Sequence, residues 1–268
     1  MVDALPTLVM GVLNVTPDSF ADGGRHFKFQ DAISHAQEMI AQGVDIIDVG
    51  GESTRPGAAR ISFEDERDRV IPVVAELKAS GAVISVDTTR AEIARLAITS
   101  GATIVNDISG GQGDPKMAAL IASNPTVQYI VMHWRGESKD MQSRAHYKDV
   151  VVEVRQELEE RVSALTESGV NPEQIILDPG IGFAKSGEHN WELLRNIDRI
   201  QLLGYPVLIG VSRKGFLGDL VGAPEPDDRD FATLAITTEM ARKGVWAVRT
   251  HSVKPHVDAM RVMRELGK

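Results

Sequence analysis

The chain has 268 residues, of which 43% are hydrophobic and 25% are charged, as in an ordinary globular protein. Its 29 Lys and Arg residues against 38 Asp and Glu residues give a net charge of −9, which argues against nucleic acid or an anionic membrane as the main partner. The chain has no cysteine, which excludes disulfides, zinc–thiolate sites and thiol nucleophiles. Since we find neither a signal peptide nor a long apolar run, we expect a cytoplasmic protein.

Apolar runs of strand length alternate with segments of helical periodicity along the chain. The predicted strands are residues 8–15, 45–49, 82–87, 103–107, 127–132, 174–178, 206–212 and 245–251. The predicted helices that follow them are residues 29–43, 64–80, 90–100, 115–122, 150–168, 191–203, 231–243 and 257–266.

A regular alternation of strand and helix implies parallel strands with right-handed crossovers. The repeats predict an α/β protein with a single (β/α)8 TIM barrel domain over residues 1–268. The active site of such a barrel lies at the carboxyl ends of its strands. The alternative is a doubly wound open sheet, which normally has a G-x-G-x-x-G turn after its first strand. No such turn follows residues 8–15.

Polar side chains stand at the ends of several predicted strands. Asp87, Asn106 and Asp178, together with Lys214, form a set suited to the edge of a flat heteroaromatic ring. A carboxylate accepts hydrogen bonds from two N–H groups, and an amide can bind an edge that carries both a donor and an acceptor. An ammonium donates to a carbonyl oxygen or a ring nitrogen. His133, after the fifth predicted strand, is interpreted as a packed or surface residue rather than a catalyst.

A second set contains Asn14, Arg55, Arg249 and His251 and is suited to a phosphate or diphosphate. Arginine supplies a planar fork, and an amide oxygen can join a magnesium ion that phosphate oxygens already hold. No Ser-His-Asp order or zinc-type histidine spacing stands out. The residues therefore favour positioning and charge stabilisation in a barrel enzyme that acts on an aromatic or heterocyclic phosphoester.

Simpler interpretations exist for the same residues. Asp178 would cap the turn that follows it, Asn14 would form an Asx turn before Pro17, and Arg249 and His251 would form a solvated edge. The convergence of several polar strand ends on one surface favours the site.

The chain resembles the dihydropteroate synthases in a series of short motifs that run from residue 10 to residue 251 in the family's order. They are MGVLNVTPDSF (10–20) with DGG (22–24), DVGGESTRPG (48–57), SVDT (85–88), ND (106–107), DPGIGF (178–183), SRK (212–214) and RTH (249–251). The first turn has no insertion, as in the housekeeping bacterial type.

The resemblance implies a (β/α)8 transferase of folate biosynthesis, the class of enzyme that sulfonamides target. It would join 6-hydroxymethyl-7,8-dihydropterin diphosphate to 4-aminobenzoate and release diphosphate, with Mg²⁺ as cofactor. The family's habit further suggests a homodimer formed through the late helices.

The resemblance also implies roles for individual residues. The pterin would be held by Asp87, Asn106, Asp178 and Lys214, beside an apolar wall that includes Met132 and Phe183. The diphosphate would be bound by Arg249, which also covers the ring, and by His251, Arg55, Thr54 and Asn14. Asn14 would also bind Mg²⁺, and Ser212 would meet the aminobenzoate carboxylate. The turn that contains Asp18 would fold over as a lid, and Asp18 would stabilise developing positive charge.

The chain departs from the family pattern at Ser252, where Asp or Asn is common, and at Ala21, where Ser is frequent. Two other functions compete. A pterin-dependent methyltransferase would need a corrinoid-binding domain, for which 268 residues leave no room. A catalytically silent pterin-binding paralogue would have no need of the cations Arg55, Lys214 and Arg249.

Overall fold

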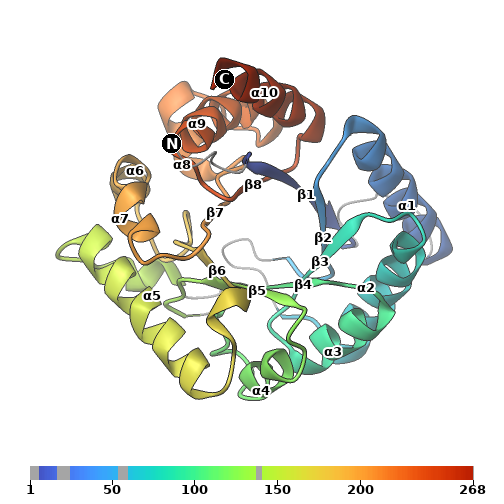
Figure 1. The fold of residues 1–268 in the computed structure, drawn as a ribbon. Helices are drawn as coiled ribbons and strands as arrows, with labels where there is room; N and C mark the ends of the chain where they lie inside the picture. The colour runs from blue at the N-terminus through green and yellow to red at the C-terminus, as the bar shows by residue number, and fades with distance from the viewer. Residues whose placement is uncertain (1–5, 17–24, 54–59, 137–140, 268) are drawn as a thin grey trace.

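The computed structural model describes residues 6–16, 25–53, 60–136 and 141–267. Within these ranges, eight parallel strands alternate with helices around a ring (Figure 1). The strands are β1 (Leu8–Asn14), β2 (Ile46–Gly50), β3 (Val83–Asp87), β4 (Ile104–Asp107), β5 (Gln128–Met132), β6 (Ile175–Asp178), β7 (Leu208–Ile209) and β8 (Ala247–Thr250). Their order in the sheet is β6-β5-β4-β3-β2-β1-β8-β7, and a parallel bridge between Leu177 and Val207 brings β6 and β7 together. The predicted (β/α)8 barrel is confirmed, and the open sheet is wrong.

The helices cover the outside of the sheet. They are α1 (Arg25–Gln42), α2 (Phe63–Lys78), α3 (Ala91–Ser100), α4 (Met117–Ala122), α5 (Val150–Glu167), α6 (Gly187–Arg195), α7 (Ile197–Gln201), α8 (Gly215–Val221), α9 (Asp230–Arg242) and α10 (Val253–Leu266). Short 3-10 turns are η2 (Met141–Arg144), η3 (Pro172–Gln174) and η4 (Asp227–Arg229). In the described part of the chain, no helix combines the length and the apolar character that a membrane span requires.

Three elements differ from the sequence prediction. The predicted helix 191–203 is two helices, because Asn196 leaves helical geometry and its side chain caps the Glu192 carbonyl at 2.9 Å. The predicted strand 206–212 is a strand only at Leu208–Ile209, with a single bridge before it at Val207. The residues after Ile209 leave the ladder and form a loop that leads into α8, a short helix that hydrophobic periodicity did not reveal.

The interior of the barrel is built in layers with a period of two residues along each strand. The lowest layer is an apolar plug made of Met10, Ile46, Ile104, Ile130, Ile176, Leu208 and Ala247. Two residues further along five of these strands stand Asp48, Asn106, Met132, Asp178 and Arg249. The barrel is therefore closed by hydrophobic side chains at its amino end and becomes polar towards its carboxyl end.

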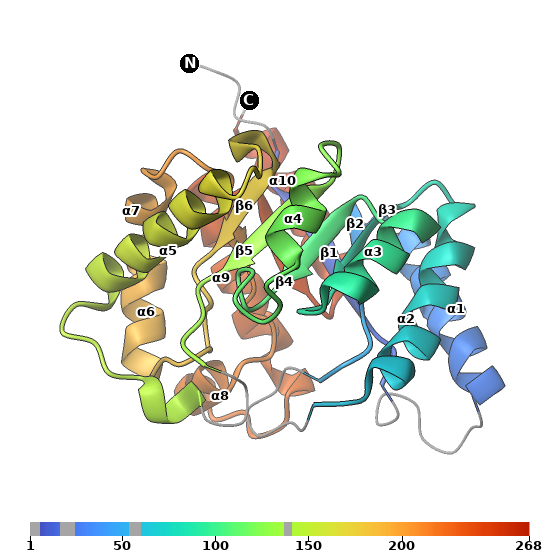
Figure 2. The ribbon, with the colours of Figure 1, turned by 90° about the horizontal axis from the view of Figure 1, so that it is seen from below.

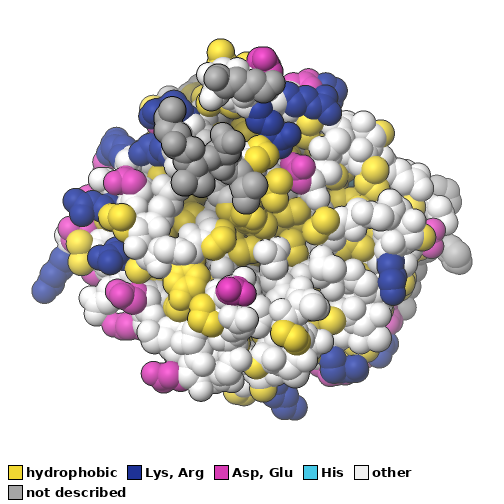
Figure 3. Space-filling view, in the orientation of Figure 1, with side chains coloured by type: hydrophobic (Ala, Val, Ile, Leu, Met, Phe, Trp, Pro, Cys, Tyr) yellow, Lys and Arg dark blue, Asp and Glu magenta, His cyan; other side chains and the backbone are white. Residues whose placement is uncertain are grey.

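The two ends of the barrel differ in the elements and side chains that they present. Figure 2 shows the loops that follow the strands gathered at one end, with α8 beside them. At the other end, drawn in Figure 3, hydrophobic side chains fill the centre and most charged side chains lie around the rim. The carboxyl end is thus the place where the chain can present polar chemistry.

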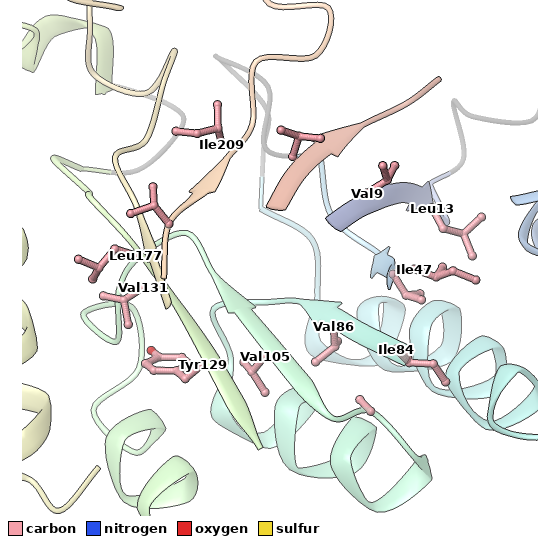
Figure 4. Close-up of a cluster of buried hydrophobic side chains, with 14 of the residues drawn as sticks. Val9, Leu13, Ile47, Ile84, Val86, Val105, Tyr129, Val131, Leu177 and Ile209 are labelled. Carbon is pink, nitrogen blue, oxygen red and sulfur yellow. The ribbon is translucent and has the colours of Figure 1, made fainter. Parts of the chain in front are cut away.

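A second hydrophobic core lies between the sheet and the helices. Val9, Ile47, Val105, Val131 and Leu177 are among the outward-facing strand residues that build it (Figure 4). Buried residues of α2, α3, α5, α9 and α10 complete it from the outer side. This core holds the strands in place and leaves their carboxyl ends available for a site.

The amino-terminal end of β6 is held by one buried side chain. The Gln174 amide nitrogen donates to three carbonyl oxygens in the α4–β5 connection, at 2.7–3.2 Å. Its oxygen accepts the Asn171 N–H at 3.2 Å. The contact adds to the backbone hydrogen bonds of this connection, in which the Ile121 and Asn124 carbonyls also accept the Asn124 and Val127 N–H groups at 3.0 Å.

We predict that Gln174→Met destabilises the protein by about 1–3 kcal/mol, because it removes the buried amide that makes these four hydrogen bonds. The measurement is the free energy of unfolding from urea titration. Gln156→Met on the exposed face of α5 is the matched control, since its amide binds only Glu160. Equal stabilities for the two variants would contradict this role of Gln174.

Candidate active site

Arg249 lies at the centre of the polar layer inside the barrel. Its Nε donates to Asp48 Oδ2 at 2.6 Å, and its Nη2 donates to Asp87 Oδ2 at 2.9 Å. The Asn106 Nδ2 also donates to Asp48 Oδ2, at 2.9 Å. These contacts join the carboxyl ends of β2, β3, β4 and β8 around one guanidinium.

Asp48 is the site residue that the sequence prediction missed. It is completely buried, and its Oδ1 has no hydrogen-bond partner among the described residues. The signal was present, because Asp48 occupies an inward position two residues beyond Ile46 on a strand that is otherwise apolar. The interpretation of Arg249 as a solvated edge is wrong, since the guanidinium pairs with two buried carboxylates.

Burial changes the protonation chemistry of the site. It raises the pKa of Asp87 to about 7, with Arg249 acting in the opposite direction and Asp48 adding to the rise. Burial likewise raises the pKa of Asp178, against the lowering effect of Lys214. It lowers the pKa of Lys214 to about 8. A ligand that brings N–H donors to these carboxylates would therefore stabilise their ionised form.

The segment after β6 depends on two glycines. Asp178 Oδ1 accepts the Gly180 N–H at 2.7 Å, so the alternative in which Asp178 caps this turn is also correct. Gly180 and Gly182 have φ angles of 66° and 83°. A Cβ on Gly180 would lie 2.6 Å from the His133 carbonyl oxygen, and one on Gly182 would lie 2.7 Å from Lys214 Cδ. Only glycine fits both positions, which explains the DPGIGF motif.

Lys214 points into the barrel next to this turn. Its Nζ donates to the Ile181 carbonyl and lies 4.6 Å from the centre of the Phe183 ring, as in a cation–π contact. The preceding Arg213 has a φ of 61° and turns the other way, where its guanidinium forms two hydrogen bonds with Asp230 at 2.8 and 2.9 Å. The left-handed conformation of Arg213 thus directs the Arg213 guanidinium outward, whereas the Lys214 ammonium points inward.

Ser212 and His251 meet at the edge of the polar layer. The Ser212 Oγ accepts the His251 backbone N–H at 3.1 Å and lies 2.9 Å from His251 Nδ1. This contact fixes the orientation of the imidazole at the edge of the polar layer.

Asn14 ends β1 at the barrel mouth. A Cβ on the neighbouring Gly50 would lie 3.8 Å from Asn14 Oδ1 and 3.6 Å from Asp87 Oδ2, so the glycine keeps the space between them open. The described ranges contain no group of three or more His, Cys, Asp or Glu side chains arranged as metal ligands. A single neutral amide oxygen fits a cation that a ligand brings with it rather than one that the protein holds alone.

The remaining predicted site residues divide into two groups. Met132 is buried at the end of β5, and its Cγ lies 3.4 Å from the position of a Cβ on Gly180, so it belongs to the same wall as the turn. Asp18, Thr54 and Arg55 lie outside the described residues. His133 is buried, as predicted, and faces α5 rather than the barrel interior.

A pocket of about 270 Å³ lies between the end of β5 and α5, and its lining includes Gln112, Trp134, Glu157 and Arg161. Most of its lining residues belong to the outer side of the barrel, so we do not place the chemistry there. The polar layer contains the convergent charged groups.

Comparisons with known proteins agree with this geometry. Residues 10–251 match the model of a family described as pterin binding enzyme. The dihydropteroate synthase of Mycobacterium leprae is 48% identical over 264 residues, which cover 96% of this chain and 93% of the relative.

Two solved structures are similar over nearly the whole chain. The Xanthomonas albilineans dihydropteroate synthase with 4-aminobenzoic acid has a TM-score of 0.92 and 38% identity, and the match covers 98% of this chain and 94% of that one. The same enzyme in complex with 7,8-dihydropteroate has a TM-score of 0.89 and 35% identity, with 99% and 95% covered. Fold, motifs and polar layer lead to one conclusion: the chain belongs to the dihydropteroate synthases, within the family of pterin-binding enzymes.

Proposed function

We propose that this chain condenses 6-hydroxymethyl-7,8-dihydropterin diphosphate with 4-aminobenzoate to give 7,8-dihydropteroate and diphosphate. The observation that carries the proposal is the polar layer around Arg249, in which three carboxyl groups, an amide and an amine converge. The X. albilineans relatives whose structures contain 4-aminobenzoic acid and 7,8-dihydropteroate support the same reaction.

The pterin ring is recognised through its polar edge. Asp178 and Asp87 accept ring and exocyclic N–H groups, and Lys214 donates to a ring carbonyl or nitrogen. The Asn106 Nδ2 is already used by Asp48, so its Oδ1 is the atom that remains for the ligand. Met132 and Phe183 provide the apolar contact beside the ring.

The diphosphate is bound by cations at the mouth of the barrel. Arg249, His251 and Arg55 neutralise its charge, and the Thr54 hydroxyl donates a hydrogen bond to it. Mg²⁺, held by Asn14 and by diphosphate oxygens, would add positive charge to the leaving group. The contact between His251 Nδ1 and Ser212 keeps the imidazole oriented beside the anion.

The second substrate enters next to Ser212. Its carboxylate is met by the Ser212 hydroxyl, and its amino group attacks the methylene carbon as the C–O bond to diphosphate breaks. Asp18 stabilises the positive charge that develops during this exchange. The reaction therefore depends on positioning and charge rather than on a protein nucleophile.

The reaction is tested by mixing purified protein with the pterin diphosphate and Mg²⁺ and following diphosphate release with and without 4-aminobenzoate. We expect release that requires aminobenzoate and stops on chelation. Lys214→Ala should lower kcat/KM about 10- to 100-fold, because it removes a charged hydrogen bond to the ring. Lys243→Ala is the control, since Lys243 Nζ binds the Arg195 carbonyl on the outside of the barrel. Tight pterin binding without release in the wild type would identify a catalytically silent paralogue instead.

The role of Asp18 has its own test. Asp18→Ala should lower kcat about 100-fold while the affinity for the pterin changes little, because its charge acts only as positive charge develops. Single-turnover kinetics at saturating substrates measure the step directly, and an unchanged rate would rule the role out.

We further propose that the chain forms a homodimer through its late helices. Leu220 and Val221 at the end of α8 and Phe231 at the start of α9 are exposed, Phe231 by 87%, and α8 packs next to η4 and α9. Exposed apolar side chains of this size on two neighbouring helices are typical of a protein–protein contact. A second copy of the chain would cover them.

Phe231→Glu should shift the protein from dimer to monomer, because it introduces a charge into an apolar contact. Sedimentation velocity at several protein concentrations provides the measurement. Val152→Glu, at an exposed position of α5, should leave the mass unchanged. A Phe231→Glu variant with the wild-type mass would contradict this interface.

A further inference from the structure

Lys185 is a buried cation that substrate recognition does not use. It is only 3% exposed. Its Nζ donates to the Phe183 carbonyl at 3.0 Å and lies 3.0 Å from His133 Nδ1. A Cβ on Gly180 would lie 3.4 Å from this Nζ, so the amine lies directly against the turn that follows Asp178.

The partners of His133 define how this contact is made. An ammonium only donates, so His133 Nδ1 accepts from Lys185 and Nε2 carries the proton. Nε2 then donates to Glu157 Oε2 at 3.0 Å on α5. Burial lowers the pKa of His133 to about 4, so the imidazole is neutral near neutral pH. It can therefore accept a hydrogen bond from Lys185 and donate one to Glu157.

The turn of residues 181–184 is held almost entirely by side chains. Four successive carbonyl groups each accept a hydrogen bond from a side chain. The donors are Lys214 on Ile181, Gln142 on Gly182, Lys185 on Phe183 and Tyr147 on Ala184. Ala184 has a φ of 49°, which is unfavourable for a residue with a Cβ, so the turn needs these contacts to keep its shape.

The segment between β5 and α5 supports the same turn from outside. Arg135 lies 3.9 Å above the Tyr147 ring and donates to Glu157 at 3.1 Å and to Glu153 at 2.9 Å. Lys185 is therefore the inner end of a network that begins at the surface of α5.

The charges that face Lys185 come from every element packed around it. They are Asp178 on β6, Lys214 before α8, Glu157 on α5, and Arg135 after β5. The neutral His133 and Tyr147 complete its surroundings. Burial lowers the pKa of Lys185 to about 7, and Asp178 acts most strongly in the opposite direction. Below that pH the ammonium in turn lowers the pKa of Asp178, which burial raises.

We propose that Lys185 is a positioning residue of the pterin site, which fixes the turn of residues 181–184 against His133 and places its amine behind the turn that follows Asp178. Lys185 does not touch the ligand. It acts through the Phe183 carbonyl, which sets the ring beside Lys214, and through its charge on Asp178. The inference rests on the proposed binding of the pterin by Asp178.

The test compares wild type with Lys185→Met, which keeps the length of the side chain and removes its charge. Calorimetry measures the Kd for 6-hydroxymethyl-7,8-dihydropterin diphosphate with Mg²⁺ between pH 5.5 and 8.5. Without the Lys185 charge, Asp178 takes up a proton at a higher pH. The variant should therefore bind about tenfold more weakly near neutral pH, and the fall in affinity on acidification should begin at a higher pH than in the wild type. Lys116→Met, on the surface before α4, should match the wild type.

A second variant separates position from charge. His133→Leu removes the acceptor but leaves the Lys185 ammonium, so it should weaken binding without moving the acid limb of the profile. In an Asp178→Asn background, Lys185→Met should no longer change the shape of the pH profile. Thermal melts of each variant establish that it is folded.

The outcomes distinguish the inference from the function on which it rests. If the wild type does not bind the pterin, the proposed function fails. If the wild type binds and Lys185→Met binds equally well with the same pH profile, the inference about Lys185 fails alone. A loss of affinity by the same factor at every pH would overturn its charge role.

Discussion

The architecture depends on one buried guanidinium. Transfer of an ion from water to a protein interior costs several kcal/mol unless partners compensate for it. Arg249 finds that compensation in the buried carboxyl groups of Asp48 and Asp87, to which its guanidinium donates. Together these three side chains join strand ends that are far apart in the chain. The carboxyl end of the barrel is polar because this set lies there.

The apolar plug beneath these three residues determines the polarity of their surroundings. Seven hydrophobic side chains close the amino end of the barrel, so water reaches the polar layer only from the mouth. Burial above the apolar plug raises the pKa of Asp87 and lowers the pKa of Lys214, in both cases towards neutral pH. A flat ring with donors on its edge can replace water there at little electrostatic cost, which is what the proposed pterin recognition requires.

Two lysines lie on either side of Asp178 and differ in what they contact. Lys214 donates to the Ile181 carbonyl and lies beside the Phe183 ring, on the side of the barrel interior. Lys185 binds the Phe183 carbonyl from behind and is tied to α5 through His133 and Glu157. The segment of residues 180–184 contains Ala184, which has a positive φ, and two positions, 180 and 182, where only glycine fits. Its shape therefore depends on the side chains that bind it. The division into a contacting and a supporting lysine follows from this arrangement.

The sequence by itself determined the eight strand–helix repeats, the period of two inside the barrel, and the polar residues at the strand ends. These features depend on residues that are neighbours in the chain, where hydrophobic periodicity is directly visible. It did not reveal the break at Asn196 or the short α8, because local caps and loops override periodicity there. Only the tertiary structure decided that Asp48 is shared by Arg249 and Asn106, which are 201 and 58 residues away from it. Only the tertiary structure, likewise, brought Lys185 to His133, 52 residues away. The partners of a buried charge can come from any position in the chain, because the fold brings them together. Local sequence patterns therefore do not identify them.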